Sequence, residues 1–252
     1  MKPLSEMVKG DISKIKMVVF DVDGVLVPRG TKIKQVGNTT TLNTKIIDKK
    51  QIEQIKKLYN KGYLINISSG RGLYMLQEMF RAILPFVSLT YENGSATWHQ
   101  GKIYQHINSF EYFHNIYPLL KKASENNPDV KGFEPKEFII TIHCNKKVPK
   151  IENIIKKDDK LTTVWNGEAY DILIKGKQTK ALGIKNIAKI FKLKKENIMA
   201  IGDNYNDQEM LNESGMPISA DKSRVNGTFY IPLEGKFLPA DNLMQKILEL
   251  KK

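Results

Sequence analysis

The stretch Phe20-Asp21-Val22-Asp23-Gly24-Val25-Leu26 joins a short apolar strand, residues 17–20, to two carboxylates and a glycine. Open α/β sheets bind their ligands at the carboxyl ends of parallel strands, which is where Asp21 and Asp23 are expected to lie. Residues two apart on a strand project to the same side, so these carboxylates would repel each other unless the chain bends at Gly24. A divalent cation such as Mg²⁺ would relieve the repulsion and bind a phosphate group.

The segments on either side of residues 95–171 alternate short apolar strands with helical patterns, which favours an open, mainly parallel α/β sheet of the Rossmann-like kind. Strands are expected at residues 17–20, 63–67, 86–91, 172–174, 198–201 and 216–219. Helices are expected near residues 44–60, 72–83, 179–191 and 210–211, with a last helix from about 241. The predicted fold class is therefore α/β.

Residues 95–171 have a different pattern. They are expected to form a hairpin (96–98 with 103–106), a helix near 110–124, a strand at 137–143, and then a helix and two strands. This segment has 11 Lys or Arg and 10 Asp or Glu, a net charge of +1, so the flanks carry the remaining +12 of the total +13. We therefore predict a discontinuous core, 1–94 and 172–252, interrupted by an α+β cap at 95–171.

A second acidic cluster, Gly202-Asp203-Asn204-Tyr205-Asn206-Asp207, follows the expected strand 198–201. Asp203 lies at the strand end and Asp207 four residues later, so both can point back over the same edge of the sheet. A single aspartate there would be explained as a helix N-cap. Four acids in two strand-end clusters with adjacent glycines favour a functional site.

The two clusters resemble the first and fourth motifs of the haloacid dehalogenase-like hydrolases. The family's second motif resembles Ser68-Ser69-Gly70-Arg71, and aligning the two selects Ser69 rather than Ser68. The family's lysine aligns with Lys180. Glu92-Asn93-Gly94 resembles the point where the Cof-type phosphatases enter their cap, and the insert is similar in size to that of the archaeal phosphoglycolate phosphatases. The sequence departs from the family at Val25, at Ala181 and in the long stretch 28–43.

The resemblance implies a Mg²⁺-dependent phosphatase that hydrolyses a small phosphorylated metabolite, a sugar phosphate or a phosphoglycolate-like compound, through an aspartyl phosphate. Asp21 is the implied nucleophile, Asp23 the acid and base, and Lys180 a positive charge at the phosphate. The implied phosphate-binding residues are Ser69, Gly70 and Asn206, and the implied Mg²⁺ ligands are Asp21, Asp23, Asp203 and Asp207. Asp207 is alternatively expected to orient Lys180.

Other interpretations of these residues remain open at this stage. Ser69 is also explained as a helix N-cap, and Arg71 fits either a structural ion pair or a phosphate ligand. Cys144, the single cysteine, alternates with apolar residues and is expected in the core rather than as a nucleophile. The four histidines have no metal-ligand spacing.

Two further functions stay open: a phosphomutase that uses the same aspartyl phosphate, and a nucleic-acid-binding module without catalysis. The sequence pI of about 9.5 would suit the latter, but the lysines are scattered and form no basic cluster. No apolar run is long enough for a membrane helix, and the start, residues 1–6, lacks the apolar block of a signal peptide. We therefore expect a cytoplasmic enzyme that is a monomer or a homodimer. Its expected partner is a small phosphorylated metabolite, and we expect it to bind neither a membrane nor nucleic acid.

Overall fold

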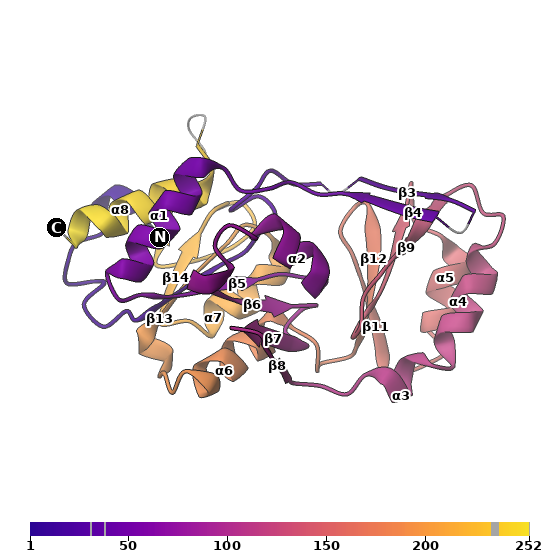
Figure 1. Ribbon diagram of the computed structural model, residues 1–252. Helices are drawn as coiled ribbons and strands as arrows, with labels where there is room; N and C mark the ends of the chain where they lie inside the picture. The colour runs from indigo at the N-terminus through magenta and orange to yellow at the C-terminus, as the bar shows by residue number, and fades with distance from the viewer. Residues whose placement is uncertain (31, 38, 233–236, 252) are drawn as a thin grey trace. The chain divides into compact units, whose positions relative to one another are not determined.

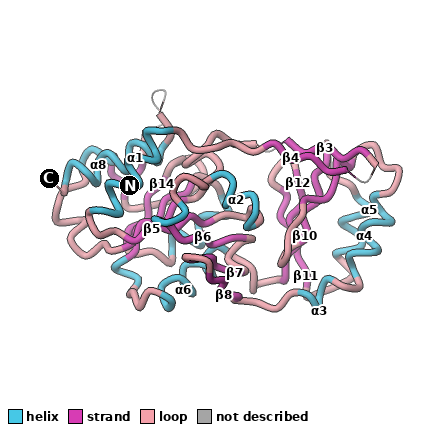
Figure 2. Tube along the Cα trace, in the orientation of Figure 1, coloured by secondary structure: helices cyan, strands magenta, loops and turns pink. Residues whose placement is uncertain are grey.

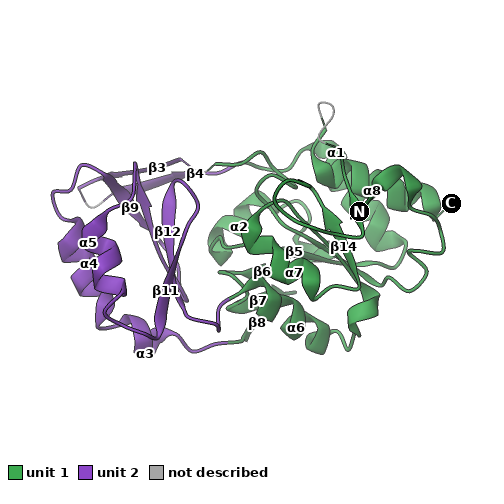
Figure 3. Cartoon of the chain, turned by 180° about the vertical axis from the view of Figure 1, so that it is seen from behind, with its two compact units in different colours: residues 1–30, 45–106, 179–252 green, residues 31–44, 107–178 purple. Residues whose placement is uncertain are grey.

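Strand β2 (Met17–Phe20), which precedes the first acidic cluster, is a central strand in the computed structural model of the chain (Figure 1). The structure describes residues 1–30, 32–37, 39–232 and 237–251. The chain forms two compact units (Figure 3). Unit 1 consists of Met1–Gly30, Lys45–His106 and Thr179–Lys252, and unit 2 of Thr31–Thr44 and Ile107–Gln178.

Within its described residues, unit 1 has a nine-stranded sheet in the order β1-β15-β14-β13-β2-β5-β6-β7-β8. The pairs from β1 to β6 are parallel, and β6–β7 and β7–β8 are antiparallel. The chain runs outward from β2 in one direction through β5 and β6, and from β13 in the other, so the sheet reverses its order between β2 and β13. Ligands bind at such a point in open α/β sheets. The other strands are β1 (Lys2–Pro3), β5 (Leu64–Ser68), β6 (Val87–Tyr91), β7 (Ala96–His99), β8 (Lys102–Gln105), β13 (Ile198–Gly202), β14 (Met216–Ser219) and β15 (Phe229–Tyr230).

Helices cover both faces of this sheet (Figure 1), which is why all four residues of β2 are apolar and buried. Helix α1 (Lys49–Asn60) packs against α8 (Pro239–Leu250) on one face. On the other face, α6 (Lys180–Ile190) and α7 (Gln208–Asn212) form an apolar cluster with β2 and β13. Unit 1 also contains α2 (Leu73–Met79) and the short 3-10 helices η1 (Leu4–Glu6), η2 (Leu84–Phe86), η3 (Lys195–Asn197) and η4 (Tyr205–Asp207).

Unit 2 contains an antiparallel sheet in the order β11-β12-β10-β9, with helices on one face (Figure 2). The alternate residues Ile140, Ile142 and Cys144 of β10 are buried in the apolar cluster with α4 and α5. This confirms Cys144 as a core residue, and burial raises the pKa of its thiol to about 11. The elements are α3 (Phe110–Phe113), α4 (Ile116–Ser124), β9 (Val130–Glu134), β10 (Ile140–Cys144), α5 (Pro149–Ile155), β11 (Leu161–Trp165) and β12 (Ala169–Ile174), with a hairpin of β3 (Lys32–Val36) and β4 (Thr39–Asn43) beside β9.

The predicted α/β class with a mainly parallel sheet is confirmed, while several local assignments differ. Residues 172–174, expected as a core strand, are the end of β12 in unit 2. The expected strand at 137–143 is present as β10 but begins at Ile140, β9 was not predicted, and the expected helix at 110–124 is divided into α3 and α4. The units also divide at different residues from the predicted domains, because the β7–β8 hairpin extends the sheet of unit 1 and residues 31–44 pair within unit 2. Among the residues that the structure describes, no helix combines the length and apolar composition that a membrane span requires.

His106, just after β8, makes the free energy of unfolding of unit 1 depend on pH. Its Nε2 lies 2.9 Å from Thr97 Oγ1, and burial, aided by the charge of Lys189, lowers its pKa from 6.5 to about 4. The folded state therefore binds fewer protons than the unfolded state. The contribution of the neutral ring to the free energy of unfolding is complete above pH 6.5, and it is lost as the pH falls through about 4.

We expect the substitution His106→Gln to remove this dependence. Between pH 7 and pH 5, the free energy of unfolding of the variant should fall by about 1 kcal/mol less than that of the wild type, a value reduced for the partial exposure of the ring. Urea unfolding at the two pH values measures the difference. An equal fall in both proteins would contradict the prediction.

Candidate active site

The ends of two neighbouring strands position the first group of site residues. Strands β2 and β13 pair in parallel with Phe20 opposite Ile201, so Asp21 and Asp203 follow adjacent strand ends. The backbone N–H of Asp21 donates to the carbonyl of Ile201 at 3.0 Å, which extends the ladder by one residue. Both side chains therefore lie at the carboxyl edge of the sheet, where its strand order reverses.

Lys180 connects the two acidic clusters. It is the first residue of α6, whose N-cap, Thr179, accepts a hydrogen bond from Leu182 N–H at 3.1 Å. The Lys180 ammonium donates to Asp21 Oδ1 at 2.6 Å and also to Asp207 Oδ1. All three residues are at least 95% buried. A lysine is unfavourable at a helix N-terminus, and here the two carboxylates compensate for that position.

The charges of this group alter one another's pKa values. Burial raises the pKa of Asp21 well above its usual range, the Asp207 carboxylate raises it further, and Lys180 opposes both effects. Burial would lower the pKa of Lys180, but the two carboxylates outweigh burial and raise it. Lys180 is therefore charged at neutral pH, and it provides the cation that keeps two buried carboxylates together.

Asp207 fixes the backbone around Asp203. Its Oδ2 accepts the N–H groups of Asp203 and Asn204, both at 3.0 Å. One carboxylate oxygen from each of Asp21, Asp203 and Asp207 lies within 4.8 Å of the others. Asp203 Oδ1 is buried and accepts no hydrogen bond, which leaves an oxygen of this acidic cluster for a ligand.

Arg29 also contacts the cluster, and the sequence pattern did not single it out. Its Nε donates to Asp203 Oδ2 at 2.8 Å, and its terminal nitrogen pairs with the same oxygen. Burial raises the pKa of Asp203, while Arg29 opposes the rise. The one available signal was a charged residue inside the long stretch 28–43, directly after the first motif.

Asp23 does not belong to the group that Asp21 forms with Asp203 and Asp207, and its carboxylate has a different partner. The carbonyl of Val22 accepts the N–H groups of three following residues, and Gly24, with φ of +88°, donates to Val27. This turn gives the two carboxylates different partners. Asp23 accepts two hydrogen bonds from Arg71, at 2.8 Å from Nε and 2.7 Å from a terminal nitrogen. Arg71 thus forms an ion pair, one of the two interpretations that the sequence left open.

The three predicted phosphate-binding residues occupy different environments. Ser69 is buried directly after β5, and its Oγ accepts the N–H of Arg71 at 3.2 Å. This bond precedes α2, whose N-cap is Gly72, so Ser69 is not the N-cap of that helix. Gly70 is half-buried beside it, and Asn206 lies exposed in η4.

Comparison with known proteins identifies the family. A sequence profile described as haloacid dehalogenase-like hydrolase matches residues 18–131 and 121–224. The chain belongs to this hydrolase family. A phosphoglycolate phosphatase of Sulfolobus acidocaldarius is 25% identical over 214 residues, which cover 83% of this chain and 86% of that protein.

Solved structures share the fold of this haloacid dehalogenase-like hydrolase. A haloacid dehalogenase-like hydrolase from Bacteroides thetaiotaomicron matches with a TM-score of 0.67 and 16% identity over 92% of this chain and 99% of that one. A protein of Thermoplasma acidophilum matches with a TM-score of 0.68 and 16% identity over 94% of this chain and 99% of the other. These findings confirm the family predicted from the motifs, and the relative that is named for its activity supports a phosphatase.

The acidic cluster of this hydrolase fits a divalent cation. Asp21, Asp203 and Asp207 offer only oxygen atoms, which are the ligands that hard cations prefer. The buried Oδ1 of Asp203 has no hydrogen bond that a metal would have to replace. Gly24 leaves room for the Asp203 side chain at this site, since a Cβ at position 24 would lie 2.0 Å from Asp203 Oδ2.

Gly94 packs closely against the N-terminus of α6, the helix that begins with Lys180. Its φ is +81°, and a Cβ on it would lie 2.4 Å from the carbonyl oxygen of Thr179 and 2.6 Å from the nitrogen of Gly183. Gly101 has the same φ of +81° with nothing within 4 Å of its Cβ position, which makes it a matched control.

We expect Gly94→Ala to lower the free energy of unfolding by about 1–3 kcal/mol more than Gly101→Ala, because only the first must displace backbone atoms as well as accept backbone strain. It should also reduce catalysis, because Lys180 moves with the helix end. Urea unfolding and steady-state kinetics of the two variants measure these effects. Equal losses would show that the close contact with α6 has no consequence.

Proposed function

We propose that the chain is a Mg²⁺-dependent phosphatase that hydrolyses a small phosphorylated metabolite through an aspartyl phosphate on Asp21. The observation that carries the proposal is the buried Asp21 carboxylate, held by Lys180 at 2.6 Å and placed beside Asp203 and Asp207. Lys180 engages Oδ1, so we assign the attack on phosphorus to the other oxygen of Asp21. Family membership and the phosphatase relative support this assignment.

In the first step a bond forms between Asp21 and phosphorus while the ester P–O bond breaks. The leaving oxygen takes a proton from Asp23, and in the second step Asp23 removes a proton from the water that attacks phosphorus, so Asp21 and inorganic phosphate are released. Both oxygens of Asp23 accept from Arg71. A proton on Asp23 therefore uses a lone pair of an oxygen that already accepts from Arg71, and it weakens that hydrogen bond.

The remaining residues bind and neutralise the phosphate in this proposal. Ser69 Oγ and the backbone N–H of Gly70 follow β5 and would donate to phosphate oxygens, with Asn206 and Lys180 as further donors. Mg²⁺ held by Asp21, Asp203, Asp207 and the backbone carbonyl of Asp23 would supply positive charge to the phosphate oxygens. We assign catalysis to unit 1 and the choice of leaving group to unit 2, as core and cap.

Phosphate release from a panel of phosphorylated metabolites and p-nitrophenyl phosphate, with Mg²⁺ or with EDTA, tests the proposal. We expect release that requires the metal, and the order of the substrates would indicate the leaving group. Release that is equal with EDTA would contradict the metal requirement. Isomerised sugar phosphate without free phosphate would instead identify a phosphomutase.

A further inference from the structure

A cavity of about 560 Å³ lies within unit 2, and none of the residues that line it belongs to the acidic cluster. It is lined by residues of α3 and α4, the end of β9 with the loop that follows it, and the β3–β4 hairpin. Its volume falls within the range of about 300–1,000 Å³ that is typical of small-molecule sites. Such sites combine apolar walls with a few polar groups, and this cavity has both.

Aromatic rings form much of the wall, among them Phe110, Phe113, Tyr117 and Phe133. Phe113 is buried in the apolar cluster of unit 2, whereas Phe110 is 55% and Tyr117 43% exposed. Tyr117 and Phe133 meet edge to face, with ring centroids 5.7 Å apart and an angle of 71° between the rings. Neighbouring rings therefore hold the exposed Tyr117 in place, and a flat ligand could stack against it at little entropic cost.

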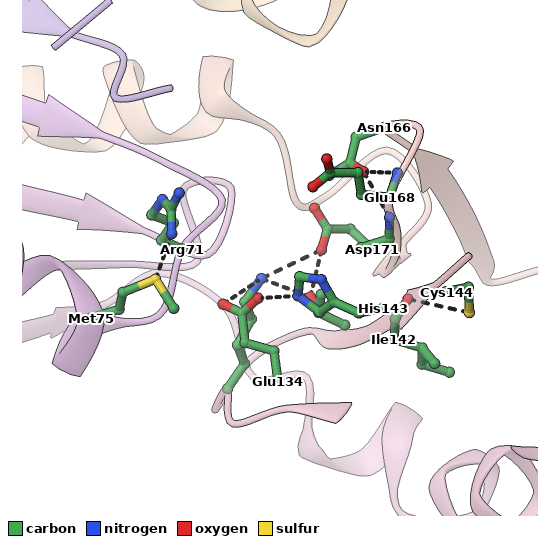
Figure 4. A network of polar contacts seen from close by, with 12 residues as sticks. Arg71, Met75, Glu134, Ile142, His143, Cys144, Asn166, Glu168 and Asp171 are labelled. Carbon is green, nitrogen blue, oxygen red and sulfur yellow. Dashed lines mark hydrogen bonds and ion pairs between the residues drawn. The ribbon is translucent and has the colours of Figure 1, made fainter. Parts of the chain in front are cut away.

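The charged side chains of the wall are not equivalent. Lys136 donates to Thr141 Oγ1 at 2.7 Å and forms ion pairs with Glu134 and Asp171, both at 3.4 Å. Glu134 in turn pairs with His143 at 2.8 Å (Figure 4). The charges of Lys136 and Glu134 are therefore compensated within this network.

Lys121 differs, because its ammonium lies over aromatic rings of the wall. It is 4.0 Å from the ring centroid of Phe133 and 5.6 Å from that of Tyr117. Within the described part of the chain, no carboxylate forms an ion pair with it. Lys121 thus offers an uncompensated positive charge beside the rings, while Glu137 adds one exposed carboxylate to the same wall.

We propose that this cavity binds a small planar aromatic anion, with its ring against Tyr117 and Phe133 and its acidic group beside Lys121. The ring geometry favours a flat, apolar body, and the ammonium favours an anionic substituent. The inference does not depend on the proposed function, because none of the residues that carry it belongs to the acidic cluster.

Two fluorescent probes of similar shape and different charge test the proposal on the full chain. Anilinonaphthalene sulfonate is an aromatic anion, and phenylnaphthylamine is its uncharged counterpart. We expect the anion to bind with a stoichiometry of one per chain and more tightly than the neutral probe. Tyr117→Ala should weaken both probes by about tenfold, and Lys121→Met, which removes the ion pair with the acidic group, should weaken the anion alone by about fivefold. Glu137→Gln should strengthen binding of the anion.

Leu119→Ala is the matched control, since Leu119 lies on α4, is 55% exposed and is not part of the wall. It should leave the affinity for both probes unchanged. Phe110→Ala serves as a second test of the wall should Tyr117→Ala disturb folding, which circular dichroism and thermal unfolding monitor. Unchanged binding of the anion in folded Tyr117→Ala and Phe110→Ala would overturn the proposal. A dimer in sedimentation that Tyr117→Ala dissociates would assign the cavity to a second copy of the chain instead.

Discussion

Replacing Asp21 with asparagine is expected to lower the rate of metal-dependent phosphate release by about 10⁴-fold or more, because an amide cannot form the aspartyl phosphate. The fold should remain intact, since the side-chain oxygen of asparagine can still accept the hydrogen bond that Lys180 donates to Asp21. Burial already disfavours the charged form of Asp21, as its raised pKa indicates, so loss of that charge should cost little stability. Phosphate assays and thermal unfolding of the purified variant measure both expectations.

Asp23→Asn is the companion variant, because it changes an acid that lies outside the acidic cluster. We expect kcat/KM, which reports the transfer to Asp21 and not the later hydrolysis, to fall by about 10²-fold or more with an alkyl phosphate, whose leaving oxygen needs a proton, and much less with p-nitrophenyl phosphate. Such a split distinguishes an acid from a nucleophile, which should be needed equally for both substrates. Activity of Asp21→Asn at the wild-type level would remove Asp21 as the nucleophile.

Lys180→Met is expected to have the largest effect on stability. It leaves the buried carboxylates of Asp21 and Asp207 without their shared cation, and an unpaired buried charge of this kind costs about 3–5 kcal/mol. Lys185→Met on the same helix removes a lysine whose side chain is 55% exposed, and should change the free energy of unfolding by less than about 1 kcal/mol. Urea unfolding of the two variants at neutral pH makes the comparison.

The deficit of Lys180→Met should shrink in acid. Burial and the neighbouring carboxylate raise the pKa of Asp21 even when Lys180 opposes them, and its loss raises that pKa further. A carboxyl group with a raised folded pKa favours folding below its unfolded pKa, and this contribution is lost as the pH rises through the folded value. The free energy of unfolding of Lys180→Met should therefore approach that of the wild type between pH 7 and pH 5. A deficit that does not change with pH would show that lost packing, not unpaired charge, is its cause.

The sequence predicted the parts of the site that depend on strand ends. Asp21 and Asp203 follow short apolar strands, and parallel strands place their ends at one edge, so their proximity could be expected before the structure was known. Lys180 was placed through the resemblance, and it does lie between Asp21 and Asp207. The roles assigned to these residues stay predictions that the variants above test.

Other features had no local signal. Arg29 contacts Asp203 across 174 positions of sequence from a stretch without periodicity. The bend at Gly24 was anticipated, but it does not indicate that Arg71, 48 positions away, would pair with Asp23. The apolar residues 172–174 are compatible with a strand in either a parallel or an antiparallel sheet, because both kinds of sheet bury such residues. Their place in unit 2 follows from pairing with β10 and β11, which periodicity alone does not reveal.

The position of β13 between β2 and β14 also bears on how the chain folds during its synthesis. Strand β2 leaves the ribosome before its neighbour β13, which belongs to the segment Thr179–Lys252. Until that segment emerges, β2 has an unpaired, wholly apolar edge, which is prone to pair with other chains. Residues 107–178, which include the whole four-stranded sheet of unit 2, are complete earlier and pair over short sequence distances. Translation therefore delivers unit 2 ahead of the sheet that holds the acidic cluster, and chaperone dependence should concentrate in unit 1.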